Sequence, residues 1–125
     1  MEKKYFKSNT SKAPLSGAVL VGNTLYISGQ LGVDPATGKM AEGGIAAQTD
    51  QAMKNLGDIL AKAGFGYKDV VKTMVWVLDV VDVPKLNEVY DGYWGEDKPG
   101  RSCVQAAFAN RQALVEIEAI AVKVE

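Results

Sequence analysis

The segment DVVKTMVWVLDV, residues 69–80, constrains the fold most, because it is apolar on both faces of an extended strand. Alternate side chains of a strand point to opposite faces. One predicted face carries Val71, Thr73, Val75 and Val77, and the other carries Met74, Trp76 and Leu78. Such a strand is typical of a sheet interior that is covered on both sides. We therefore expect this segment at the centre of a sheet.

Two amphipathic helices are available to cover that sheet. Apolar residues recur at three- and four-residue spacing over residues 44–63, and a second such stripe follows Asp82 and Pro84 and ends before Gly95. A hairpin is expected around Gly22-Asn23, and two further strands, 102–109 and 113–124, are expected to be joined by a short polar turn. The order of elements predicts an α+β fold, a mixed β-sheet with both helices on one face.

Two helices leave the other sheet face uncovered. In the last expected strand Ile117 and Ala119 point to one face, whereas Glu116, Glu118 and Ile120 point to the other. An apolar sheet face without a helix is expected to meet another subunit. The sequence therefore predicts an obligate homo-oligomer, and a site near the last strand is expected at the subunit interface.

The composition excludes several classes of function. The chain has 125 residues, which fits one domain over residues 1–125, and its net charge of −1 disfavours nonspecific binding of nucleic acid. It contains one cysteine and no histidine, so Ser-His-Asp and Cys-His mechanisms are impossible and no metal site is expected. Neither a secretory signal nor a bilayer-spanning segment is recognisable, and we expect a cytoplasmic protein without contact to membranes.

Arg101 and a pair of glutamates are the first candidates for a site. Arg101 follows a turn, DKPG, and its guanidinium could grip a carboxylate with two parallel hydrogen bonds. Glu116 and Glu118 lie about 7 Å apart on one strand face and could form an acid/base pair. A surface arginine and a solvated strand face explain the same residues, and the pattern alone favours that simpler interpretation.

Cys103, Ser28 and Gly29 are weaker candidates. Nothing next to Cys103 in the sequence offers a base for a nucleophilic thiol, so a small buried apolar side chain is the simpler interpretation, although its backbone could contact a ligand. Ser28 and Gly29 end an expected strand, where a hydroxyl and an open backbone N–H could reach a carboxylate. Turn formation explains these two residues equally well.

The motifs YISGQLGVDPATG, KTMVWVLDV, LNEVYDGYW, PGRSCV and VEIEAIAV occur in this order along the chain. In sequence and spacing they resemble the RidA family, also called the YjgF family, of reactive intermediate deaminases. The resemblance runs from about Ala13 to the end of the chain. It implies a chorismate-mutase-like fold assembled as a homotrimer with clefts between subunits, and hydrolysis of enamines and imines, such as 2-aminoacrylate, to 2-keto acids and ammonia without a cofactor.

The same resemblance implies roles for individual residues. Arg101 matches the arginine that holds the substrate carboxylate, and Glu116 matches the glutamate that positions the attacking water. Cys103 matches a pocket cysteine that contacts ligand through its backbone carbonyl. Ser28, Gly29 and Asn87 match residues that line the pocket.

Leu15 departs from the family pattern. Many deaminases of the family carry a tyrosine at this position, so Leu15 removes a hydrogen-bond donor and leaves open which imino acid is the substrate. Two alternatives to a deaminase also stay open. One is a noncatalytic module that binds a keto acid or related metabolite, and the other is an RNA-directed translation inhibitor or endoribonuclease.

Overall fold

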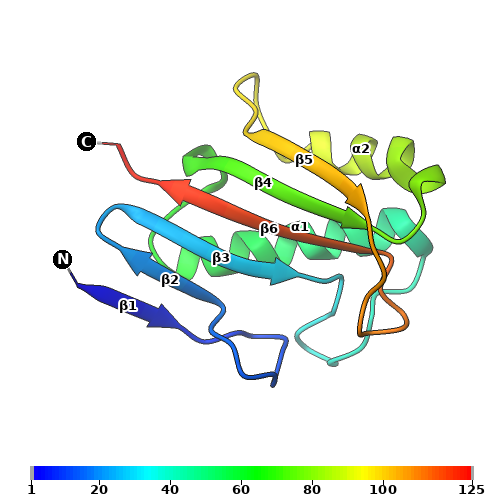
Figure 1. Ribbon diagram of the computed structural model, residues 1–125, viewed down its shortest axis with the longest axis horizontal. Coiled ribbons are helices and arrows are strands. Elements are labelled where there is room, and N and C mark those ends of the chain that lie inside the picture. The colour runs from blue at the N-terminus through cyan, green and yellow to red at the C-terminus, as the bar shows by residue number, and fades with distance from the viewer. Residues whose placement is uncertain (1, 125) are drawn as a thin grey trace.

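The computed structural model describes residues 2–124, which form one six-stranded sheet with two helices against one of its faces (Figure 1). The sheet order is β1-β2-β3-β6-β4-β5, in which β4 and β5 are parallel and the other neighbours are antiparallel. The strands are β1 (Lys3–Phe6), β2 (Ala18–Val21), β3 (Thr24–Gln30), β4 (Val70–Val77), β5 (Gly100–Gln105) and β6 (Val115–Val122). This is the mixed α+β sheet that the sequence predicts.

The helices α1 (Gly44–Lys62) and α2 (Val83–Asp91) bury their apolar stripes in one core with the inner strands β3, β6 and β4. Leu56 and Leu60 of α1 and Leu86 of α2 are completely buried, as are Val75 of β4 and Ile117 of β6. The predicted positions of both helices on one face are confirmed. Within residues 2–124, neither helix is long and apolar enough to span a bilayer.

The opposite face of the sheet has no helix over it. The register of β4 and β6 places Met74 beside Glu118 and Trp76 beside Glu116 on this open face. Tyr26 on β3 belongs to the same face and is 51% exposed. The structure therefore confirms the uncovered face that the sequence predicts.

A bulge in β4 corrects one detail of that prediction. The pairing of β4 with β6 shifts register between Val70 and Lys72. Val70 is buried as a result and Val71 is half exposed, so the assignment of Val71 to the same face as Thr73 and Val75 is wrong. Strict alternation does not anticipate an inserted residue, which reverses the faces of a strand beyond it.

Three further features differ from the sequence-based expectation. The strand β1 is not predicted, because its run KKYF has only two apolar residues and lies at a sheet edge where lysines face water. Helix α2 ends at Asp91, and Tyr93 and Trp94 continue to pack on the core from the turn behind it. The last two strands are shorter than the predicted 102–109 and 113–124, and β4 lies between them in the sheet.

Candidate functional site

A hollow of about 340 Å³ lies at the end of β3, beside the start of β6. It brings together four residues that the sequence singles out, namely Leu15, Ser28, Gly29 and Glu116. The remaining lining residues are Ser8, Thr10, Ser11, Lys12, Gln30, Leu31, Val33, Ala109 and Asn110. The hollow thus combines one carboxylate, several hydroxyls and an apolar wall.

A second bulge shapes this hollow. The pairing of β3 with β6 shifts register between Ile27 and Gln30, so Ser28 and Gly29 form the irregular part of the strand. The Glu116 side chain lies across Gly29, and a Cβ at position 29 would come within 2.2 Å of its Oε2 atom. Position 29 must therefore be glycine for Glu116 to keep this orientation.

Ser28 anchors the segment that carries Leu15. Its hydroxyl donates to the Ser16 carbonyl at 2.6 Å, and its backbone N–H donates to the Gly17 carbonyl at 2.9 Å. The hydroxyl proton is thus already used within the protein, and Ser28 can offer a ligand its oxygen lone pairs. Leu15, which is 49% exposed, stands at the rim of the hollow.

Glu116 is half-buried, and this burial raises the pKa of its carboxyl group above the ordinary value of 4.5. The negative charge of Glu118 raises it further, because Glu118 lies on the same face of β6. Glu118 itself is exposed and does not line the hollow. The two glutamates therefore differ in environment, and Glu116 is the one that lies where it could exchange a proton with a ligand in the hollow.

Arg101 and Cys103 lie on the other face of the sheet. They pair with Thr73 and Val75 of β4, whose side chains are buried beneath the helices. The Arg101 Cζ atom lies 5.0 Å from the centre of the Tyr90 ring on α2. Cys103 packs against the core, which fits the interpretation as a small apolar side chain.

A single copy of the chain cannot bring Arg101 and Glu116 together. Glu116 lies level with Trp76 and Val104, three residues along β5 from Arg101. With β4 between β5 and β6, the two backbones are about 14 Å apart, and the side chains point to opposite faces. Asn87 is exposed on α2, on the side of the sheet where Arg101 lies. The predicted residues thus form two separate groups.

Sequence reasoning missed parts of both groups. The loop with Ser8 and Lys12 reaches the hollow because β1 pairs with β2, and that strand is not recognisable in the sequence. Thr73 and Tyr90 approach Arg101 only through the parallel pairing of β4 and β5. The alternating pattern of β4 predicts the face on which Thr73 lies, but it does not predict that Arg101 of β5 lies beside Thr73.

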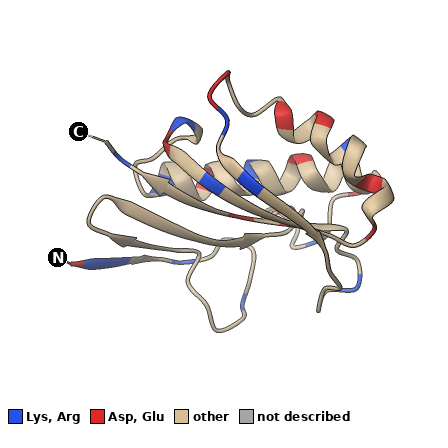
Figure 2. Cartoon of the chain, turned by 45° about the horizontal axis from the view of Figure 1, so that its top comes forward, with Lys and Arg blue, Asp and Glu red and all other residues tan. Residues whose placement is uncertain are grey.

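The charged residues do not form one continuous basic surface on the sheet. Figure 2 shows basic residues on β1 and on β4 and β5, near opposite edges, whereas β2 and β3 between them carry no charged residue. The basic residues of the sheet are therefore divided between strands near its two edges.

The chain is similar to known proteins over nearly its whole length. The sequence model of the family described as endoribonuclease L-PSP matches residues 7–123. The 2-iminobutanoate/2-iminopropanoate deaminase of Rattus norvegicus is 45% identical over 120 residues, which cover 92% of this chain and 88% of that protein. A RutC family protein of Pyrococcus horikoshii is 42% identical over 125 residues, which cover 98% and 99%.

Solved structures agree with the sequence relatives. A putative endoribonuclease from Thermotoga maritima superposes with a TM-score of 0.92 at 39% identity, covering 100% of both chains. RidA from an Antarctic Psychrobacter gives a TM-score of 0.90 at 39% identity, covering 96% and 99%. TdcF of E. coli with bound serine gives 0.89 at 31% identity, covering 97% and 99%. The chain therefore belongs to the endoribonuclease L-PSP family, the family of the RidA and YjgF proteins.

Proposed function

We propose that this protein hydrolyses 2-imino acids and their enamine tautomers to 2-keto acids and ammonia. The observation that carries the proposal is the half-buried Glu116 carboxylate, held over Gly29 inside a hollow, in a chain whose mammalian relatives are named imine deaminases. At the level of class, the chain is a deaminase-like enzyme, because these relatives are 42–45% identical over most of its length.

The chemistry requires little more than one positioned carboxylate. The Glu116 carboxylate accepts a proton from water while the water oxygen bonds to C2 of the protonated imine, and the C=N double bond becomes a single bond. The nitrogen then takes up the proton from Glu116 and the C–N bond breaks to release ammonia. The hydroxyl on C2 gives its proton to the Glu116 carboxylate and becomes the keto group. The raised pKa of Glu116 suits this return of the proton.

Arg101 of a second copy supplies the carboxylate clamp in this proposal. Within residues 2–124 the Arg101 guanidinium takes part in no ion pair or hydrogen bond, so its donors are free for a ligand carboxylate. Because Arg101 and Glu116 lie on opposite faces of one chain, both can reach one substrate only across a contact between copies. A homotrimer with one cleft at each contact satisfies this condition.

Leu15 favours substrates with aliphatic side chains. Leu15, Leu31 and Val33 line the same hollow as Glu116 and give it apolar surface, and apolar walls select by size and hydrophobicity. We expect 2-iminobutanoate and bulkier aliphatic imino acids to be hydrolysed at least as fast as 2-iminopropanoate. Replacing Leu15 by tyrosine is expected to shift this preference toward the smaller substrate.

The direct test couples a pyridoxal-phosphate serine/threonine dehydratase to this protein and follows the decay of the imine. The wild type is expected to accelerate ammonia release, and Arg101→Ala and Glu116→Gln are expected to lose this effect. Tight binding of keto acids without any acceleration would instead identify a noncatalytic sensor. Cleavage of RNA that survives Arg101→Ala and repeated purification would identify an RNA-directed protein.

A mixing experiment tests the site between copies. The two inactive variants Arg101→Ala and Glu116→Gln are coexpressed. A site between copies then has both residues intact only where an Arg101→Ala copy supplies Glu116 and a neighbouring Glu116→Gln copy supplies Arg101. Random assembly in equal amounts gives about one quarter of the wild-type activity per site. Failure to recover any activity in proven mixed oligomers would refute a site shared between copies.

A further inference from the structure

The guanidinium of Arg101 lies over the ring of Tyr90, a residue that takes no part in the proposed hydrolysis. Its Cζ atom lies 5.0 Å from the centre of the Tyr90 ring, which is within the range of a cation–π attraction. Arg101 is only partly buried and, among residues 2–124, has no acidic partner. The Tyr90 ring is therefore a group that attracts this cation without competing for its N–H donors.

Tyr90 is itself anchored by a hydrogen bond to the core. Its ring is 7% exposed, and its phenol oxygen shares a 2.7 Å hydrogen bond with the hydroxyl of Thr73, which is completely buried. Thr73 is the residue of β4 that pairs directly with Arg101 of β5. The three residues thus form a closed arrangement, in which the strand partner of the arginine fixes the ring beneath its head group.

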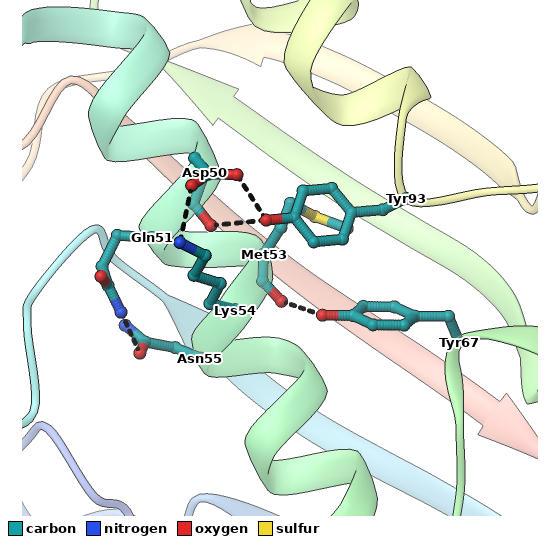
Figure 3. A network of polar contacts seen from close by, with 7 residues as sticks. All are labelled: Asp50, Gln51, Met53, Lys54, Asn55, Tyr67 and Tyr93. Carbon is teal, nitrogen blue, oxygen red and sulfur yellow. Dashed lines mark hydrogen bonds and ion pairs between the residues drawn. The ribbon is translucent and has the colours of Figure 1, made fainter.

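The position of α2, which carries Tyr90, is fixed in the same way. Trp94 contacts Tyr90 with ring centres 5.4 Å apart. In Figure 3 the Tyr93 hydroxyl donates to the Asp50 carboxylate of α1 at 2.5 Å, and the Tyr67 hydroxyl donates to the Met53 carbonyl at 2.6 Å. The aromatic cluster of Tyr67, Tyr90, Tyr93 and Trp94 therefore links α1 to the end of α2, the helix that carries Tyr90.

We propose that Tyr90, anchored by Thr73, is a positioning residue that holds the Arg101 guanidinium ready for the carboxylate of the ligand. The proposal rests on the carboxylate-binding role of Arg101 in the proposed function. An aromatic ring attracts a cation without a lone-pair acceptor, so the N–H edge of the guanidinium stays available for two parallel hydrogen bonds. A preordered arginine also loses less conformational freedom when the ligand binds.

The test measures pyruvate binding by calorimetry in the assembled protein, with pyruvamide, which lacks the negative charge, as the control ligand. Tyr90→Phe keeps the ring but loses the hydrogen bond to Thr73. Trifluorinated phenylalanine at the same position loses the same bond and also weakens the negative face of the ring, so the two variants differ only in the attraction of the ring for a cation. Relative to Tyr90→Phe, we expect the fluorinated ring to lower pyruvate affinity about 3- to 30-fold. Pyruvamide affinity is expected to stay the same.

Variants that lack Arg101 test whether the ring at position 90 acts on pyruvate affinity through the arginine. In an Arg101→Ala background, fluorination at position 90 is expected to leave the remaining pyruvate affinity unchanged, because there is no cation to attract. Thr73→Val is expected to weaken pyruvate binding in the presence of Arg101 and not in its absence. A merely structural role of Tyr90 would instead change the melting temperature equally in both backgrounds.

Each outcome distinguishes this inference from the proposed function. Pyruvate affinity that is indifferent to the ring, or absent in the wild type, overturns the positioning role. Affinity that depends on the ring in a protein that does not accelerate imine hydrolysis supports the positioning role and refutes the deaminase. Deamination together with an unaffected affinity refutes the positioning role alone.

Discussion

Replacing Gly29 by alanine tests whether the orientation of Glu116 is essential. An added Cβ would lie 2.2 Å from Glu116 Oε2, 2.7 Å from Cδ and 2.9 Å from Cγ, whereas ordinary contacts begin at 3.4 Å. The carboxylate must therefore move by about 1.2 Å to restore an ordinary contact. A misplacement of about 1 Å at a reacting group can reduce a rate about 100-fold, and we expect a loss of that order in kcat/KM for imine hydrolysis.

The stability of the Gly29→Ala variant is expected to change little. The atoms nearest to the new methyl group belong to the end of a flexible side chain, which can turn away. Alanine also restricts the unfolded chain more than glycine does, which stabilises by about 0.4–1 kcal/mol. The melting temperature should therefore stay within about 5 °C of the wild type.

The matched control is Gly95→Ala, because a Cβ at position 95 meets no atom within 4 Å and its φ is not positive. This variant should keep full activity. The imine-decay assay is run on both variants, together with Glu116→Ala and the double variant Gly29→Ala/Glu116→Ala, in which the clash no longer exists. A folded Gly29→Ala protein with wild-type kcat/KM would refute the reasoning, because Glu116 would then work from another position.

Three further predictions concern ionisation and stability. Because the pKa of Glu116 is raised in the folded protein, its ionisation opposes folding as the pH rises above about 4.5, so Glu116→Gln should raise the melting temperature at pH 8 and leave it unchanged at pH 4. Glu118→Gln removes a neighbouring charge, so carbon NMR titration should show a lower pKa for Glu116. Tyr93→Phe removes the hydrogen bond that does most to lower the pKa of Asp50. It should cost about 1 kcal/mol in urea unfolding at pH 7, and this cost should shrink as the pH falls below 3.8, because the stability from a lowered carboxyl pKa is lost as the pH falls through the pKa of the folded state. An unchanged urea midpoint at pH 7 would contradict this last expectation.

The elements with strong periodicity could be predicted from the sequence. The apolar stripe of α1 and the two apolar faces of β4 identify a central strand and a covering helix, and both follow from local spacing alone. The edge strand β1 could not be predicted, because an edge strand needs few apolar residues and its pairing with β2 is a tertiary choice. The bulge at Val71 could not be predicted either, because the partner strand sets the register of β4.

The candidate site could be predicted only in part. The family resemblance, which the comparisons confirm, draws attention to Arg101 and Glu116 as one pair. Nothing in a linear sequence indicates that β4 separates their strands and that their side chains point to opposite faces. The roles of these residues stay predictions until the variants are measured.

In the proposed assembly, the uncovered sheet face and the separation of Arg101 from Glu116 are connected. Covering the open face with a third helix would bury Trp76 and Met74 within one chain, but it would also cover the face on which Glu116 lies. A second copy can bury the same apolar surface and, at the contact, bring its own Arg101 toward the hollow. Assembly and completion of the site are then one event, so a substitution that weakens the contact should reduce activity in proportion to the loss of oligomer. Diluting the wild-type protein should also reduce activity in proportion to the loss of oligomer, and this test requires no substitution.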